Sequence, residues 1–379
     1  MGRIPLYRVV LTVLCSLVFT LTPAFAQDNG GAAQRVYIGT YTGGGSEGVY
    51  LLNFDAKTGD LSMEGLAVVT GSPSYLVQHP SLPVIYAAAS NDSIRGFTMD
   101  PKSGMLSLIN EQPTGGKGPC HVDISPDGKR VVASNYSSGS IGVVAVDETG
   151  ALGESVAFFQ HKGSSANTSR QEGPHAHSAN FGPMGKYFVA ADLGTDELRI
   201  YQYDHQSGQV LPHHHPVTST APGAGPRHFS FHPNHKFAYV VNELDNTVTG
   251  YTWDMIKGTL SPIQTISTLP DDFTEKNSTA HITVHPSGKF LYASNRGHDS
   301  IAVYGIDQDT GKLTARGQTS TEGKTPRNFA VDPAGQFLLA ANQSTNDVVV
   351  LKINQEDGTL TYTGKQVEVV NPVCVLFTR

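Results

Sequence analysis

The chain has 379 residues, of which 40 are glycine and 16% are charged, and its net charge is −7 at pH 7. The acidic balance excludes a basic nucleic-acid-binding surface as the main feature, and the 39% of apolar residues can fill a core, which excludes a disordered chain. Few charges and many glycines favour β-structure with many turns over a helix bundle.

The chain is predicted to begin with a secretory signal peptide, residues 1–26. A positively charged start leads into an apolar run at 9–21, which is too short to span a bilayer comfortably, and Ala24-Phe25-Ala26 has the small–x–small pattern of a cleavage site. Residues 27–34 are predicted to be a flexible leader. We therefore expect a periplasmic or secreted protein with no membrane association after cleavage; an uncleaved anchor is the alternative.

One short turn pattern, an acidic or amide residue followed by glycine three or four positions later, occurs seven times after this leader. Its glycines are Gly59, Gly104, Gly150, Gly208, Gly258, Gly311 and Gly358, at a mean spacing of about 50 residues. Asp or Asn caps such a turn through its side chain, and glycine takes the positive φ that closes it. A second turn with proline near its start, as at His285-Pro286, lies upstream of most copies.

Apolar segments of four to eight residues lie between these turns and are rich in β-branched or aromatic residues, as at 290–295 and 300–306. They are predicted strands. Each repeat then holds four antiparallel strands, A to D in chain order. A four-stranded unit repeated about every 50 residues predicts an all-β, seven-bladed β-propeller, one domain over residues 35–379.

The two ends of the chain are predicted to share one blade. The first copy starts at Arg35 in strand B, and its missing strand A corresponds to 372–378, which aligns with 226–232. The C-terminal strand would close the ring and remove an exposed sheet edge. Cys120 and Cys374 then belong to blades 3 and 1, so we do not expect a disulfide between them.

The face that carries the D-to-A and B-to-C loops is the predicted binding face. The two longest insertions, 160–173 and 266–279, are both D-to-A loops. A position at the strand ends that differs from blade to blade is not required by the repeated fold, so it is a candidate for a functional residue. Those that converge on the channel mouth are Glu243, Arg296, Tyr136, Arg227, Arg327, His121, His177, His228 and His281, with His175 just outside.

The segment 225–244, GPRHFSFHPNHKFAYVVNEL, resembles the hallmark of the seven-bladed lactonase family, which includes propeller-type 6-phosphogluconolactonases and fungal carboxymuconate cyclases. Shorter matches at 118–121, 175–177 and 325–327 extend the resemblance over the mature chain. The resemblance implies a site built on Arg227, Glu243, Arg296 and one histidine of the His175/His177 pair.

Opening a sugar lactone needs an activated water and donors where the oxyanion develops. Glu243 is the predicted general base, a role that His175, His177 or His228 can share. Arg227 and Arg296 are predicted to hold the oxyanion or a substrate phosphate. The predicted substrate contacts are His228, His121, His281, Arg327 and Tyr136.

The sequence has no convincing nucleophilic serine elbow and no tight metal-ligand spacing, so direct water attack without metal or cofactor is expected. The run His213-His214-His215 is expected to be exposed on the rim. The expected partner is a small-molecule lactone bound by a monomer.

Three functions stay open: an exported lactonase, a carboxymuconate-type cycloisomerase, and a non-catalytic propeller that binds a ligand. Export counts against a phosphorylated intracellular substrate. The alternative for Glu243, Arg296 and Arg227 is an ion pair that ties blades together, and for His121 and His281 a structural role at a strand end.

Overall fold

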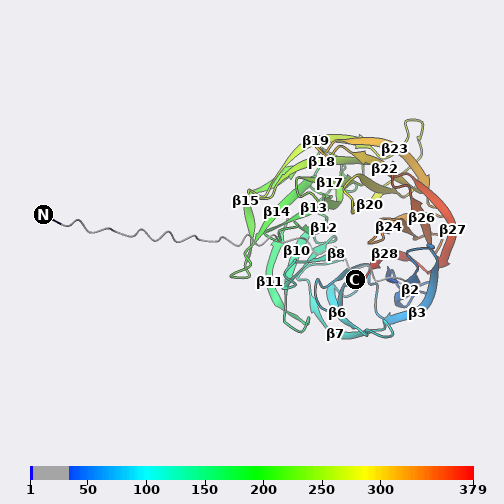
Figure 1. The fold of residues 1–379 in the computed structure, drawn as a ribbon, viewed down its shortest axis with the longest axis horizontal. Helices are drawn as coiled ribbons and strands as arrows, with labels where there is room; N and C mark the ends of the chain where they lie inside the picture. Colours follow the sequence, from blue (N-terminus) through cyan, green and yellow to red (C-terminus); the bar gives the residue numbers. More distant parts are fainter. Residues whose placement is uncertain (3–33) are drawn as a thin grey trace. The chain divides into compact units, whose positions relative to one another are not determined.

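The computed structural model describes residues 1–2 and 34–379, so all but the first two residues of the predicted signal peptide, and all of the predicted leader except Gln34, lie outside the described residues. Residues 34–379 form 28 β-strands and contain no helix (Figure 1). Accordingly, the described part of the chain offers no helix of the length and apolar character needed to cross a membrane.

The strands form seven antiparallel sheets of four strands each, which confirms the predicted seven-bladed β-propeller. In chain order the strands are β1 (Gln34–Thr40), β2 (Gly48–Phe54), β3 (Leu61–Val69), β4 (Tyr75–Gln78), β5 (Val84–Ala89), β6 (Ser93–Met99), β7 (Leu106–Pro113), β8 (Pro119–Ile124), β9 (Arg130–Asn135), β10 (Ser140–Val146), β11 (Leu152–Gln160), β12 (Ala176–Phe181), β13 (Tyr187–Asp192), β14 (Glu197–Tyr203), β15 (Val210–Ser219), β16 (Pro226–Phe231), β17 (Phe237–Asn242), β18 (Thr247–Asp254), β19 (Thr259–Ser267), β20 (Thr279–Val284), β21 (Phe290–Asn295), β22 (Ser300–Ile306), β23 (Leu313–Ser320), β24 (Pro326–Val331), β25 (Phe337–Asn342), β26 (Asp347–Ile353), β27 (Leu360–Glu368) and β28 (Pro372–Phe377).

Blade 1 is closed by the C-terminal strand, as predicted. Its sheet has the order β28-β1-β2-β3, whereas blades 2 to 7 each use four consecutive strands. β28 pairs antiparallel with β1, with Val375 opposite Ile38 and Phe377 opposite Val36. The first and last strands of the chain are thus hydrogen-bonded to each other, so β1 is paired on both edges, with β28 on one side and β2 on the other.

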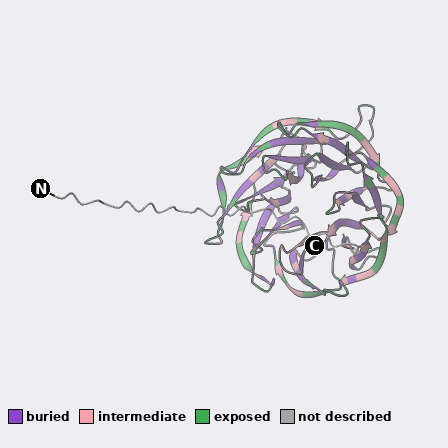
Figure 2. Cartoon of the chain, in the orientation of Figure 1, coloured by how far each residue is buried: buried purple, intermediate pink, exposed green. Residues whose placement is uncertain are grey.

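The core of the propeller lies between blades. Seven clusters of buried side chains each join residues of two neighbouring sheets. The second strand of a blade is covered on both faces, and β5, β13, β17, β21 and β25 are buried at every residue. In the outermost strand only the first residue is buried and the rest are exposed or partly exposed, as in β7 and β27 (Figure 2). This explains why the inner strands read as continuous apolar runs and why the chain has few charges.

The repeated turn glycines have a second function besides their positive φ. All seven have φ between 67° and 88°. In four blades the carbonyl of this glycine accepts a hydrogen bond from a buried tyrosine of the preceding blade, as Gly311 does from the Tyr239 hydroxyl at 2.9 Å. A Cβ on Gly311 would meet the Phe237 ring at 2.5 Å. The glycine therefore also permits close packing between blades.

Two side-chain expectations have different outcomes. Cys120 and Cys374 are both free, which agrees with the prediction that they do not pair. The prediction that His213-His214-His215 is exposed is wrong for His213, which is 3% exposed. Its ring turns inward and packs edge-on against Tyr187 at 5.3 Å between centroids, while His214 and His215 are exposed.

Candidate active site

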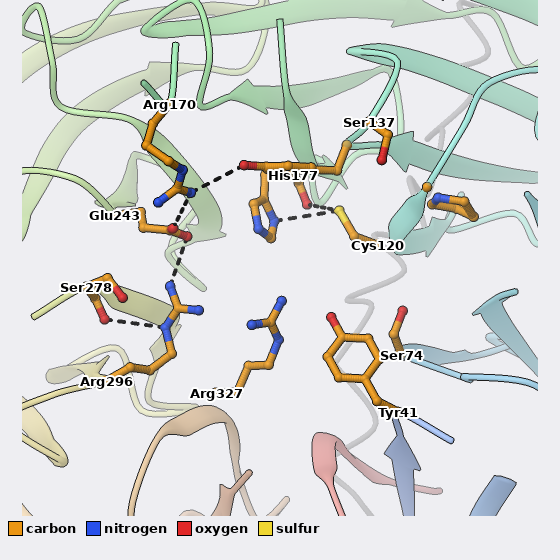
Figure 3. A pocket seen from close by; sticks show the side chains of 13 residues that line it. Tyr41, Ser74, Cys120, Ser137, Arg170, His177, Glu243, Ser278, Arg296 and Arg327 are labelled. Carbon is orange, nitrogen blue, oxygen red and sulfur yellow. Dashed lines mark hydrogen bonds and ion pairs between the residues drawn. The ribbon is translucent and has the colours of Figure 1, made fainter. Parts of the chain in front are cut away.

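A pocket of about 530 Å³ opens on the face where the D-to-A and B-to-C loops meet (Figure 3). Every lining residue except Arg170 lies at the end of a second strand or at the entry to a first strand, and Arg170 lies in a loop between a fourth and a first strand, which agrees with the predicted binding face. The lining residues are Tyr41, Ser74, Gly118, Pro119, Cys120, Tyr136, Ser137, Arg170, His177, Glu243, Ser278, Arg296 and Arg327.

A repeated β-bulge directs side chains toward this pocket. In blades 3, 4, 5 and 7 the register between the first and second strands shifts at one residue of the first strand, namely Cys120, His177, Arg227 and Arg327. A bulge leaves one residue unpaired and re-aims its side chain. The residue after each bulge, such as His121 or His228, returns to the regular ladder and does not line the pocket.

Glu243 is the centre of the charged part of the site. It follows β17 directly, and its backbone N–H donates to the Gly225 carbonyl at 2.7 Å. Its carboxylate is 6% exposed and pairs with Arg227 at 2.8 Å and Arg296 at 2.9 Å through Oε2, and with Arg170 at 2.7 Å through Oε1. The interaction between Glu243 and Arg296, predicted to be either catalytic or structural, is therefore one part of a four-residue cluster.

Burial alone would raise the pKa of Glu243, but the charges of Arg296 and Arg227 outweigh it and hold that pKa well below its usual range. Both carboxylate oxygens are already engaged with guanidinium groups. A carboxylate with such a lowered pKa is a weak base, but its charge can hold the guanidinium groups around it in fixed positions. The geometry thus favours Glu243 as the residue that fixes the arginines over the predicted role of general base.

The three arginine partners have different access to the pocket. Arg227 is 1% exposed, does not line the cavity, and donates from Nη1 to the Ala280 carbonyl at 2.5 Å. Arg296 lines the cavity and is held by the Ser278 and Thr279 carbonyls. Arg227 therefore has no direct access to the cavity and pairs with Glu243, whereas Arg296 can donate to a ligand directly.

Arg170 is the functional candidate that the sequence analysis missed. It lies in the loop between β11 and β12, its side chain is 41% exposed, and its Nη2 also lies 3.3 Å from the Tyr136 hydroxyl. The signal was the length of that loop, which marked it as an insertion on the binding face. Loops of this kind differ in length from blade to blade, so comparison between repeats could not single out one of its residues.

His177 and His175, which sequence analysis could not separate, occupy different environments. His177 lines the pocket, and its Nδ1 lies 3.7 Å from the Cys120 Sγ. Burial first, and then the charge of Arg227, place its pKa well below the usual value, so its imidazole is neutral at neutral pH. His175 stacks on Tyr136 at 4.5 Å, and its two ring nitrogens face the Tyr136 carbonyl at 3.0 Å and Glu172 at 3.4 Å. His177 is therefore the histidine with a nitrogen available to a ligand.

Three further predicted residues, His121, His228 and His281, do not line the pocket. His228 packs edge-on against His177, and His121 and His281 pack edge-on against His228. The Nδ1 atoms of His228 and His281 are 2.8 Å apart, so one must donate and the other accept. His121 lies against the Tyr75 ring at 4.0 Å. Their predicted contact with substrate stays a prediction. Tyr136 and Arg327, predicted for the same role, do line the pocket.

This histidine cluster predicts an acid-sensitive fold. Burial, followed by nearby positive charge, lowers the pKa of His121 to about 3 and that of His281 to about 3. At a pH between about 6.5 and this lowered pKa, each of these histidines is protonated in the unfolded chain and neutral in the folded chain. The free energy of unfolding therefore decreases as the pH falls, by about 1.4 kcal/mol per pH unit for each histidine. Asp123 acts in the opposite sense, because burial raises its pKa to about 7.

We expect His121→Gln to flatten the dependence of stability on pH by about 1.4 kcal/mol per pH unit between pH 6.5 and 4.5, as measured by urea unfolding. His215→Gln, which changes an exposed histidine, is the control and should leave the slope as it is. If the free energy of unfolding has the same slope against pH in His121→Gln and in the wild type, His121 already binds its proton in the folded protein over this pH range.

No group of three or more His, Cys, Asp and Glu side chains within the described ranges is arranged to hold a metal ion. What the arrangement offers is a neutral imidazole beside cationic donors. Such a site can deprotonate a water molecule and stabilise an oxyanion.

Comparisons with known proteins point in the same direction. The family model described as "Lactonase, 7-bladed beta-propeller" matches residues 35–377. A protein named 6-phosphogluconolactonase from Bacillus subtilis (strain 168) is 40% identical over 295 residues, which cover 77% of this chain and 83% of that protein. The solved structure of a periplasmic gluconolactonase from Pseudomonas aeruginosa is similar with a TM-score of 0.85 at 30% identity, covering 92% of this chain and 99% of the other.

Proposed function

The chain belongs to the seven-bladed β-propeller lactonase family, and we propose that it is an exported hydrolase that opens a sugar lactone by addition of water. The observation that carries the proposal is the neutral imidazole of His177 in a pocket lined by Arg170 and Arg296, both held by Glu243. The names of the relatives support a sugar lactone as substrate. The predicted signal peptide and the periplasmic relative support action outside the cytoplasm.

In the proposed reaction, the lactone carbonyl lies between His177 and the two arginines. His177 accepts a proton from water as the water oxygen attacks the carbonyl carbon, and Arg170 and Arg296 donate to the oxyanion that forms. The bond between that carbon and the ring oxygen then breaks, and His177 returns the proton to the ring oxygen. The product is the open-chain hydroxy acid, so no cofactor enters the balance.

The test is pH-stat hydrolysis of gluconolactone and its 6-phosphate against a buffer blank. We expect His177→Gln to lower kcat by about 10²-fold or more with little change in KM, because it removes the proton acceptor. His215→Gln, which makes the same change at an exposed histidine outside the lining, is the matched control and should keep wild-type kcat. Wild-type kcat in His177→Gln would overturn its role, and no rate above the blank on either lactone would favour a non-catalytic propeller.

Export is tested on cells that express the full chain. The protein should be recovered from the periplasm or the medium with an N-terminus after Ala26. Recovery of the chain in the cytoplasm with residues 1–26 intact would count against export.

A further inference from the structure

The loop that carries Arg170, residues 161–175 between β11 and β12, is held by buried polar groups that the proposed reaction does not use. Gln171, which follows Arg170 in the sequence, is fully buried. Its Nε2 donates to the Leu193 carbonyl and to Asp196 Oδ1, both at 2.8 Å, and its Oε1 accepts from a backbone N–H within the loop at 2.9 Å. The side-chain amide of Gln171 is therefore engaged at both ends, directly beside Arg170.

Asp196 joins this loop to the segment that places Glu243. It lies between β13 and β14 and is 3% exposed. Its Oδ1 also accepts from the Gly225 N–H at 2.7 Å, and the Gly225 carbonyl accepts from the Glu243 N–H at 2.7 Å. Arg170 and Glu243, which form an ion pair at 2.7 Å (Figure 3), are thus both connected to one buried carboxylate.

Comparison between blades separates the hydrogen bonds of Asp196 that belong to the repeated fold from those that do not. In three other blades the residue at this position also has a positive φ and accepts a hydrogen bond from a backbone N–H of the following loop, at 2.8–2.9 Å; these residues are Asp92, Asp299 and Asn346. The bond from Gly225 repeats this pattern. Asp196 additionally accepts from Gln171 and from the Ser165 hydroxyl at 2.5 Å. Both of these donors belong to the loop of Arg170, so a structural position of the repeat also holds this loop.

Arg170 depends on its loop for orientation more than the other arginines of the cluster do. Its side chain is 41% exposed, against 12% for Arg296 and 2% for Arg227, so packing restrains it least. Donors stabilise an oxyanion most when they are fixed in place before the charge develops. The backbone at Arg170 must therefore be held by groups outside the cavity lining, as Gln171 and Asp196 are.

We propose that Gln171 and Asp196 are positioning residues, which hold the loop so that Arg170 donates to the oxyanion of the lactonase reaction. The inference rests on the proposed function and goes beyond it, because it assigns a role to two buried residues outside the cavity. Gln171 acts on turnover through Arg170 alone. Its loss should therefore lower kcat only while Arg170 is present.

The experiment is a double-mutant cycle, measured by pH-stat on gluconolactone and its 6-phosphate. Gln171→Met keeps the length of the side chain and removes its hydrogen bonds. We expect it to lower kcat by about 10-fold and to change KM by less than about 2-fold, because a donor used in the transition state is misplaced. Arg170→Met should lower kcat by about 10²-fold, and the double variant should match it within about 2-fold. If the two losses multiply in the double variant, the proposal is overturned.

Gln264→Met is the matched control. The Gln264 side chain also makes two hydrogen bonds, with the N–H and the carbonyl of Leu313 in the next blade at 2.8 and 3.1 Å, but it lies outside the pocket lining. The control should lower the midpoint of urea unfolding about as far as Gln171→Met does and keep wild-type kcat. A fall in kcat as large as that of Gln171→Met would assign the effect to general destabilisation and contradict a positioning role.

Hydrogen exchange tests the hold on the loop without reference to activity. In Gln171→Met the amides of residues 161–175 should exchange about 10-fold faster than in the wild type, and in Gln264→Met at the wild-type rate. Unchanged exchange in Gln171→Met would overturn the proposal whatever its turnover. If exchange is faster but the wild type hydrolyses neither lactone, Gln171 does hold the loop and it is the lactonase function that fails.

Discussion

Removal of residues 372–379 is expected to abolish the cooperative thermal transition of the propeller. The deletion takes away β28, which is the innermost strand of blade 1 and the pairing partner of β1. Val373, Cys374 and Val375 are buried on that strand at 3%, 2% and 6% exposure. At about 1.5–3 kcal/mol for each buried apolar side chain, their loss approaches the whole stability of about 5–15 kcal/mol of a typical protein.

The deletion also breaks contacts on both sides of the seam. The Val375 N–H donates to Asn328 Oδ1 of blade 7 at 2.8 Å, and the Leu76 N–H of blade 2 donates to the Cys374 Sγ at 3.3 Å. Circular dichroism and calorimetry are the measurements. Deletion of Arg379 alone is the control, because this residue is exposed and follows the last strand. A truncated chain that melts cooperatively at the wild-type temperature would show that the other six blades hold the ring without closure.

The fold could be predicted from the sequence because its signals are local and repeated. Each turn glycine is required by its own φ and by the close packing of a side chain from another blade, so the pattern recurs in every blade regardless of function. Closure of the ring could be predicted from the comparison of the repeats, because the first repeat lacks one strand and the last residues of the chain match that missing strand. The side of the propeller that carries the site followed from the lengths of the loops.

The site could be predicted in part. Glu243, Arg296, His177, Arg327 and Tyr136 line the pocket as the differences between blades indicated. The β-bulge decides which of two consecutive residues leaves the regular ladder and turns toward the site, and neither composition nor periodicity shows a bulge. His228 therefore could not be separated from Arg227, nor His121 from Cys120. Arg170 could not be found, because loops of this kind differ in length between blades and their residues cannot be compared position by position.

Glu243→Gln is expected to lower both activity and stability. The substitution keeps the shape of the side chain but removes the charge that pairs with Arg227, which is 1% exposed. Removal of one partner from a buried ion pair costs about 3–5 kcal/mol, because the other charge stays buried without compensation. Arg170 and Arg296 also lose their common anchor. We expect kcat to fall by about 10³-fold, the size of effect seen when oxyanion donors are lost.

A double substitution separates positioning from base catalysis. If Glu243 serves to balance and orient the arginines, Arg227→Met combined with Glu243→Gln removes the buried unpaired charge. The double variant should then be more stable than Glu243→Gln alone and regain part of kcat, because residues in one ion-pair network are not additive. If Glu243 were instead the base that takes the proton from water, the second substitution could restore stability but not turnover. Urea unfolding and pH-stat rates on the same four proteins, the wild type, both single variants and the double variant, therefore decide which of the two chemistries this carboxylate performs.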